Sequence, residues 1–171
     1  MEPVTAYIGI GSNVGDRFAW LQRAVDHLAQ LPCTAVRGVS RVYMTEPFGD
    51  PDQERYFNAV AAVETALDPA DLRAHCKAIE HDLGRPDRYR RWSPRTIDLD
   101  ILLYGDLCAE SDLLVIPHSE MHHRKFVLVP LLDLANPIHP RLHRSIAELL
   151  KSCDDNSVPV RLVEQLKIGR I

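Results

Sequence analysis

Apolar and polar residues alternate along the first part of the chain in a pattern that predicts strands and helices in turn. The apolar run at 6–10 predicts a buried strand that ends in a glycine-containing turn. Apolar residues then recur at helical spacing over 18–28, after Asp16 as a helix-starting residue. Two further apolar, β-rich runs, 36–43 and 56–63, predict the second and third strands.

The pattern continues with a second helix and a fourth strand. Asp68 has the side chain of a helix N-cap, a proline follows it, and Gly84 ends the helical spacing. Strict alternation over 97–101 predicts a strand. The order β-α-β-β-α-β is that of a ferredoxin-like fold, an α/β (α+β) class with two helices on one face of the sheet. We expect a further short strand near Val115 and helices near 125–134 and 146–150.

Length and composition narrow the class of protein. A chain of 171 residues, 46% hydrophobic and 26% charged, fits one globular domain over residues 1–171. The net charge of -4 argues against a surface devoted to nucleic acid. No stretch reaches the ~20 apolar residues of a membrane helix, and the first residues lack a signal-peptide pattern. Four scattered cysteines without a C-x-x-C pair indicate reduced thiols, so we predict a cytoplasmic monomer.

An arginine-rich segment precedes the fourth strand. Five arginines stand within 85–95, opposed by Asp87, and two prolines in the segment argue against a helix. Guanidinium groups present rigid donor forks that match phosphate oxygens, so a loop of this kind can neutralise a polyphosphate. Taken by itself, the run of charges is also explained by a solvated basic loop that binds no ligand. The arginines are Arg85, Arg88, Arg90, Arg91 and Arg95.

Two aspartates follow the arginines at strand spacing. Because side chains alternate along a strand, Asp98 and Asp100 leave the same face, with carboxylates ~6.6 Å apart along the strand. Such a pair can hold one Mg²⁺ or share two. A half-exposed strand also explains the alternation. A Mg²⁺-bound triphosphate requires acidic metal ligands beside a basic loop. A solvated basic loop would not predict the aspartate pair, and a half-exposed strand would not predict the arginines.

Other motifs point less clearly to a function. The glycines at 9, 11 and 15 have the spacing G-x-G-x-x-x-G, which disfavours a dinucleotide-binding reductase. Histidines 118, 122, 123, 139 and 143 lack a recognised zinc-ligand pattern, and His118 with Arg124 fits a phosphate contact better. Three aromatic residues, Tyr56, Trp92 and Phe126, lie beside polar clusters and could stack a flat ligand, although each could equally be core.

Four segments together resemble the 6-hydroxymethyl-7,8-dihydropterin pyrophosphokinase family. They are RWSPRTIDLDI at 91–101, YIGIGSN at 7–13, YMTEPFG at 43–49 and IPH at 116–118. The resemblance covers about residues 5 to 140, and its R-x-x-P-R-x-x-D-x-D core is highly specific. It implies transfer of the β,γ-diphosphate of ATP to the hydroxymethyl oxygen of the pterin, releasing AMP, in folate biosynthesis.

The resemblance also implies roles for individual residues. Two Mg²⁺ would be held by Asp98 and Asp100, which with Arg85 and Arg95 form the catalytic set. The ATP side would include Glu80, Arg85, Trp92, Arg95, Ile101, His118 and Arg124. The pterin side would include Gly11, Thr45, Pro47, Phe48, Tyr56, Asn58 and Phe126. ATP and the pterin are the expected partners, without nucleic acid or membrane.

Some positions depart from the family pattern. Lys77, Asp87, Ser93 and Ser119 stand where a glutamine, an arginine, a glycine and a tyrosine are expected. These changes concern the nucleotide side and leave the pterin and metal residues intact. A nucleic-acid-binding module of the same topology is the competing function, but it lacks the aromatic-glycine strand signature that stacks bases.

Overall fold

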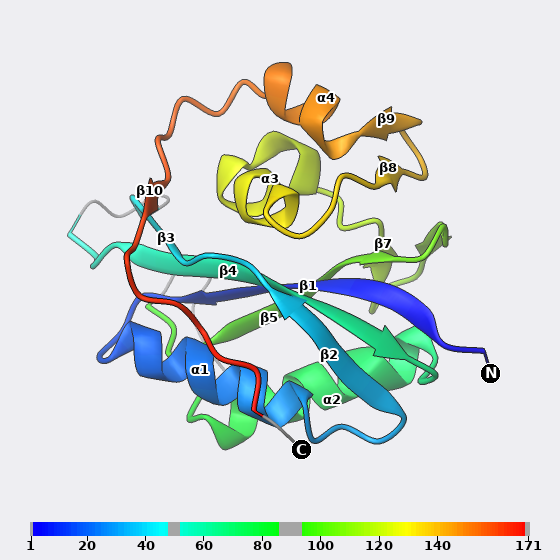
Figure 1. Ribbon diagram of the computed structural model, residues 1–171, viewed down its shortest axis with the longest axis horizontal. Coiled ribbons are helices and arrows are strands. Elements are labelled where there is room, and N and C mark those ends of the chain that lie inside the picture. The colour runs from blue at the N-terminus through cyan, green and yellow to red at the C-terminus, as the bar shows by residue number, and fades with distance from the viewer. Residues whose placement is uncertain (1, 48–51, 86–93, 170–171) are drawn as a thin grey trace.

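The computed structural model describes residues 2–47, 52–85 and 94–169. Its elements up to the fourth long strand are β1 (Val4–Ser12), α1 (Arg17–Leu28), β2 (Thr34–Val39), β3 (Tyr43–Thr45), β4 (Tyr56–Thr65), α2 (Pro69–Asp82) and β5 (Asp98–Tyr104) (Figure 1). They are followed by β6 (Ala109–Glu110), β7 (Val115–Ile116), the 3-10 helix η1 (Met121–His123), α3 (Lys125–Leu132), β8 (Ile138–His139), β9 (Arg144–Ser145), α4 (Ile146–Lys151) and β10 (Val160–Arg161).

One antiparallel sheet organises the molecule. Its strand order is β10-β3-β4-β1-β5, and β2 also pairs with β4. With β2 and β3 counted as one strand, this is the order of the predicted β-α-β-β-α-β core. The α/β prediction is therefore confirmed, including the C-terminal strand and helices that were expected beyond the core.

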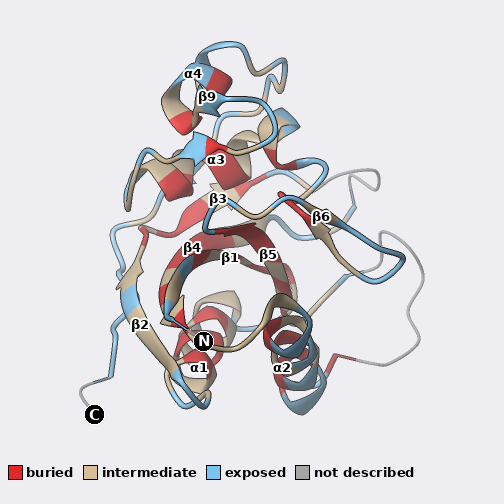
Figure 2. Ribbon diagram, turned by 90° about the vertical axis from the view of Figure 1, so that its right-hand side faces the viewer, coloured by how far each residue is buried: buried red, intermediate tan, exposed pale blue. Residues whose placement is uncertain are grey.

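Helices cover both faces of the sheet. Figures 1 and 2 show α1 and α2 on one face and α3 and α4 on the other. The first face is packed by Ile8, Leu99 and side chains of α1 and α2 in one buried cluster. A second buried cluster joins Leu102 and Val60 to α3 and α4. The sheet is thus the middle of three layers.

The ends of the first two helices are set by the residues that the sequence indicates. Asp16 accepts a hydrogen bond from the backbone N–H of Ala19 at 3.0 Å, and Asp68 accepts one from Asp71 at 2.9 Å. Gly84 has a φ of 89°, which favours glycine, and it lies just beyond α2. Local sequence therefore sets where α1 and α2 begin and where α2 ends.

The second predicted strand is divided in the structure. Residues 40–42 lie between β2 and β3, both of which pair with β4, so three residues stand opposite two. At this bulge Ser40 donates its backbone N–H to the carbonyl of Val60 and accepts the Val60 N–H on its side-chain oxygen, both at 2.8 Å. The prediction of one continuous strand over 36–43 was wrong because the Ser40 hydroxyl replaces a backbone acceptor.

The C-terminal segment returns across the sheet edge. Figure 1 shows it passing from α4 beside β3, where it forms β10, and then down to α1. Leu166 is buried in the cluster with α1 and α2. Among the described residues, no helix combines the length and apolar character needed to cross a bilayer.

Candidate active site

A cavity lies between the sheet and the beginning of α3. Its empty space measures about 860 Å³ when the open mouth is included. Ten residues that the sequence assigned to the site line it: Gly11, Thr45, Tyr56, Asn58, Arg95, Asp98, Asp100, His118, Arg124 and Phe126. The cavity therefore gathers side chains from β1, β3, β4, β5 and the segment that leads into α3.

The floor of this cavity is made by small and polar residues of adjacent strands. In the register of β1 with β5, Gly11 stands opposite Asp98 and Gly9 opposite Asp100. A Cβ atom at Gly11 would lie 3.0 Å from Oδ1 of Asn58, so a side chain there would crowd the amide. Asn58 donates from Nδ2 to Oγ1 of Thr45 at 2.7 Å. The floor thus presents a fixed amide and hydroxyl beside two carboxylates.

Aromatic rings come from two different elements around the cavity. Tyr56 belongs to β4, and Phe126 belongs to the first turn of α3. The guanidinium carbon of Arg124 lies 5.7 Å from the centroid of the Phe126 ring, within the distance of a cation–π contact. Rings contributed by the sheet and by α3 can hold a flat heterocycle between them.

Asp98 is held by two arginines. Its Oδ1 is 2.6 Å from Nη1 of Arg85, and its Oδ2 is 2.7 Å from Nη1 of Arg95. Burial alone would raise the pKa of Asp98, but the charges of Arg95 and Arg85 outweigh it and lower that pKa. Asp98 is therefore ionised at neutral pH and fixes Arg95 at the cavity wall and the buried Arg85, which lines neither cavity, behind it.

Asp100 is in the opposite electrostatic situation. Burial and the neighbouring charge of Asp98 raise its pKa, and Lys77 opposes this only in part, with Nζ 4.0 Å from Oδ1 of Asp100. The two carboxylates thus repel one another across the strand face. A divalent cation would relieve this repulsion.

The open edge of β5 is closed by two side chains of α2. Glu80 is 3% exposed, and its carboxylate accepts from the backbone N–H of Leu99 at 2.7 Å and pairs with Nη1 of Arg85 at 2.8 Å. Lys77 donates to Glu80 at 2.9 Å and to the Leu99 carbonyl at 3.4 Å. Burial lowers the pKa of Lys77, but the carboxylates of Glu80 and Asp100 outweigh it and raise that pKa. Lys77 also lines the second cavity described below, and the sequence marked it only as a departure from the family pattern.

His118 stands beside Asp100 with a defined proton position. Burial lowers the pKa of His118, although the charge of Asp100 opposes the shift. Nδ1 accepts the backbone N–H of Glu120 at 3.2 Å. The neutral ring therefore carries its proton on Nε2 and can donate it to a bound anion.

A second cavity shares Asp100 and His118 with the first. Its lining is otherwise drawn from α2, β5 and the β7 region: Arg73, Cys76, Lys77, Leu99, Ile101, Leu113, Leu114, Val115 and Ser119. Two ligands, one in each cavity, would meet at Asp100 and His118. This arrangement suits a transfer between two bound molecules.

The donor set at β5 fits Mg²⁺. Within the described part of the chain, no group of three or more His, Cys, Asp and Glu side chains is placed to hold a metal ion. Mg²⁺ commonly takes one or two carboxylates and completes its shell with water and substrate phosphates. Asp98 and Asp100, both at the cavity, offer two hard oxygen ligands of this kind.

The remaining residues assigned from the sequence have different positions. Pro47 is half-buried at the end of the described segment, and Glu80 lies behind Arg85 rather than on a cavity wall. Ile101 lines the second cavity. Phe48 and Trp92 lie outside the described residues, as do most of the arginines of the 85–95 segment.

Three of the other histidines come together on the α3 side of the molecule. The ring centroids of His122 and His123 are 3.9 Å apart, and those of His122 and His139 are 6.0 Å apart. Burial lowers the pKa of His122 and that of His139. This cluster lines neither cavity, whereas His118 lines both.

Comparison with known proteins agrees with the chemistry of the cavities. Residues 7–136 match the sequence profile of the family described as 7,8-dihydro-6-hydroxymethylpterin-pyrophosphokinase (HPPK). A Haemophilus influenzae 2-amino-4-hydroxy-6-hydroxymethyldihydropteridine pyrophosphokinase is 41% identical over 91% of this chain and 96% of its own length. Proteins of the same name from Methylorubrum extorquens and Pseudomonas aeruginosa are 47% and 43% identical, over 76% and 86% of this chain and 82% and 90% of their own lengths.

Solved structures show the same fold at low sequence identity. A Plasmodium falciparum HPPK-DHPS, wild type with STZ-DHP, aligns with a TM-score of 0.68 at 17% identity over 88% of this chain. An HPPK-DHPS in complex with substrates aligns with a TM-score of 0.69 at 14% identity over 89% of this chain. The chain spans 43% of each of these longer chains, and the likeness concerns the fold.

Proposed function

Because the chain belongs to the 7,8-dihydro-6-hydroxymethylpterin-pyrophosphokinase family, we propose that it transfers a diphosphate group from ATP to 6-hydroxymethyl-7,8-dihydropterin in folate biosynthesis. The pterin hydroxymethyl oxygen forms a bond to the β-phosphorus of ATP. The bond from that phosphorus to the α,β-bridging oxygen breaks, AMP leaves with the oxygen, and the hydroxyl proton passes to solvent.

The single observation that carries this proposal is the meeting of two cavities at Asp100 and His118. The cavity with Tyr56 and Phe126 suits the flat pterin, whose polar edge would face Asn58 and Thr45. Gly11, Pro47 and Phe48 complete the proposed pterin residues. The polar cavity beside Ile101 suits ATP, so the phosphates would reach the pterin hydroxyl across the shared residues.

Asp98 and Asp100 would hold two Mg²⁺ in this reaction. Bound Mg²⁺ supplies charge neutralisation of the phosphates and lowers the pKa of the attacking hydroxyl. The contribution of the protein is to keep two carboxylates on one strand face at the junction of the cavities. The pKa of Asp100 is raised by burial and by repulsion from Asp98, and a bound cation would relieve that repulsion.

Cationic side chains would bind the phosphates. Asp98 already holds Arg95 at the wall of the first cavity and the buried Arg85 behind it, and His118 can donate from Nε2. Arg124 on the opposite wall and Trp92 complete the proposed ATP contacts, with Glu80 holding Arg85 in place. Catalysis then rests on positioning and charge neutralisation rather than on a strong general base.

The proposal is tested by incubating the protein with ATP, Mg²⁺ and the hydroxymethyl pterin and separating the nucleotides. AMP and the pterin diphosphate should appear in equal amounts, and addition of EDTA should stop both. ADP as the product would contradict diphosphate transfer. Binding of RNA without a need for metal, in the absence of AMP formation, would favour the nucleic-acid module instead.

We also propose that residues 1–171 act as one domain. Support comes from the C-terminal segment, where Lys167 exchanges hydrogen bonds of 2.9 and 2.8 Å with the side chain of Gln22. The chain end is thereby tied to the first helix.

A further inference from the structure

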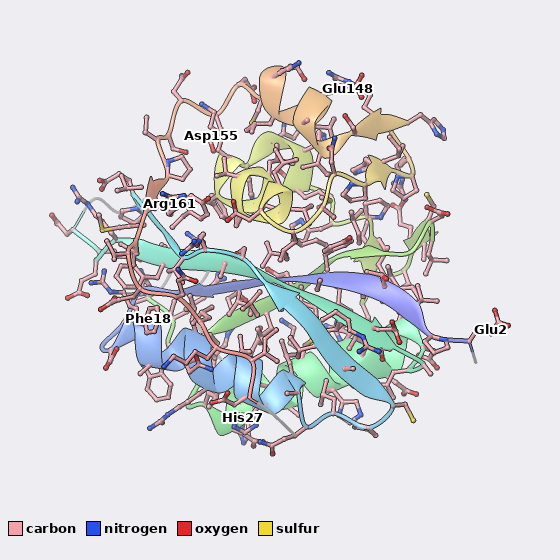
Figure 3. All side chains as sticks on the ribbon, viewed as in Figure 1. Glu2, Phe18, His27, Glu148, Asp155 and Arg161 are labelled. Carbon is pink, nitrogen blue, oxygen red and sulfur yellow. The ribbon has the colours of Figure 1, made fainter. Side chains whose placement is uncertain are left out.

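The C-terminal strap, defined as residues 154–167, contacts both sides of the proposed pterin cavity. The strap lies beyond the family match, which ends at residue 136. Figure 3 shows Asp155 beside α3 and Arg161 in β10, which pairs with β3. Both α3 and β3 lead directly into residues that line the cavity.

At α3, the strap supplies a missing helix cap. The N-cap position is Arg124, which has no side-chain hydrogen bond to the helix backbone. A guanidinium group has no acceptor atom, so it cannot bind the free N–H groups of a first turn. The backbone N–H of Lys125 instead donates to Oδ2 of Asp155 at 2.8 Å. Asp155 therefore caps a helix that begins thirty residues earlier in the chain.

The same carboxylate also holds the strap in place. Oδ1 of Asp155 accepts the backbone N–H of Ser157 at 2.8 Å. Nζ of Lys125 reaches the carbonyl of Ser157 at 3.4 Å. Both carboxylate oxygens are thus engaged, one by α3 and one by the strap, and the negative charge lies at the favourable end of the helix.

At the other side of the cavity, the strap extends the sheet. Val160 pairs with Met44 and Arg161 with Tyr43, and the N–H of Leu162 donates to the Val42 carbonyl at 2.9 Å. These pairs lie immediately before Thr45 in β3, the partner of Asn58 on the cavity floor. The strap consequently links the wall that carries Phe126 to the strand that carries Thr45.

We propose that Asp155 is a positioning residue for the pterin site, acting through the Lys125 backbone to fix Phe126 and Arg124 at the start of α3. The inference rests on the proposed function, in which Phe126 stacks against the pterin. Phe126 and Arg124 flank Lys125 on either side, so a first turn that loses its cap loses the orientation of both side chains. Asp155 touches no proposed substrate position itself.

The test compares Asp155→Ala with two other variants. Asp155→Asn keeps one acceptor oxygen, and Glu164→Ala removes an equal charge from an exposed position of the strap. Two quantities are measured well below the unfolding temperature of each variant. They are the hydrogen-exchange rate of the Lys125 amide and the dissociation constant of the pterin, with Mg²⁺ and a non-hydrolysable ATP analogue present.

We expect Asp155→Ala to speed exchange at Lys125 at least tenfold and to weaken pterin binding about tenfold. Asp155→Asn should fall between Asp155→Ala and the wild type, and Glu164→Ala should match the wild type in both measurements. Faster exchange with unchanged pterin binding would overturn the positioning role, and unchanged exchange would overturn the cap. A wild-type protein that neither binds the pterin nor forms AMP would instead contradict the proposed function, whatever the exchange rates show.

Discussion

The two faces of the central sheet are built from the same strands but have different roles. One face is packed by helices, and the other lines a cavity. Toward α1 and α2, β1 presents Ala6 and Ile8, which are buried in one apolar cluster and line neither cavity. Toward α3, Gly11 of β1 and Asp100 of β5 line a cavity. Strand periodicity thus lets stability and chemistry change independently within a few consecutive residues. Substitutions on the two faces should separate into losses of fold and losses of activity.

The largest expected effect is a loss of activity without a loss of stability. Asp100→Asn should lower kcat roughly a thousandfold, or ~4 kcal/mol, because it removes a proposed Mg²⁺ ligand. The pKa of Asp100 is raised by burial and by Asp98, so its charge is unfavourable to the metal-free fold at neutral pH. Tm in EDTA should therefore stay level or rise. A near-native rate would contradict the metal assignment, and a fall in Tm would contradict the electrostatic account.

A residue of the packed face should show the reverse. Ile8 is fully buried on that face and lines neither cavity, so Ile8→Ala should lower the free energy of unfolding by ~3 kcal/mol through lost contacts and a cavity. Urea unfolding measures this loss. The kcat of the protein that remains folded should stay within about threefold of the wild type. A loss of activity as large as that of Asp100→Asn would show that the two faces are not independent.

A smaller effect is expected at the floor of the cavity. Gly11→Ala places a Cβ atom 3.0 Å from Oδ1 of Asn58 and should raise KM for the pterin roughly tenfold, or ~1.4 kcal/mol, by displacing the amide. Gly9→Ala is the matched control because its Cβ would lie 3.4 Å from the Leu102 side chain, an ordinary contact distance. Equal KM values for the two variants would remove Asn58 from the proposed pterin contacts.

The smallest effect concerns pH and the helix above the cavity. Burial would raise the pKa of Asp155, but hydrogen bonds from Ser157 and Lys125 outweigh it and lower that pKa. A lowered carboxyl pKa contributes stability that is complete above the unfolded value, near 3.8, and disappears as pH falls through the folded value. The difference in unfolding free energy between wild type and Asp155→Asn should be about 1 kcal/mol at pH 7 and vanish near pH 2. A difference that persists in acid would have another origin.

Residue patterns alone predicted the parts of the site that have local causes, whereas residues such as Tyr56 and Phe126 were assigned to it by the family resemblance. Alternation over residues 97–101 placed Asp98 and Asp100 together, and helix caps at Asp16 and Asp68 are visible in the sequence because each acts on its own helix. The break at Ser40 was missed because it depends on a side-chain hydroxyl bonding to another strand. The contacts of the strap could not be predicted for the same reason, because Asp155 caps a helix that begins thirty residues earlier in the chain. Contacts between distant segments leave no periodic signal.

Lys77 illustrates a different limit. Its identity as an unexpected residue was evident, but its contacts with Glu80 and the Leu99 carbonyl depend on how α2 lies along β5. The sequence contains no marker of that helix-to-strand distance. The structure shows that Lys77 forms an ion pair with Glu80 and lies beside Asp100.

The contacts made by Glu80 also bear on whether another strand could pair with the outer edge of β5. β5 is the outer strand of the sheet, and an outer strand with free N–H and C=O groups is a template on which another chain can add. At Leu99 the N–H donates to Glu80 and the carbonyl accepts from Lys77, so neither group is available to an incoming strand. Replacing Glu80 would therefore do more than remove an ion-pair partner of Arg85. It would also expose an unpaired backbone N–H at the edge of β5, beside the proposed active site.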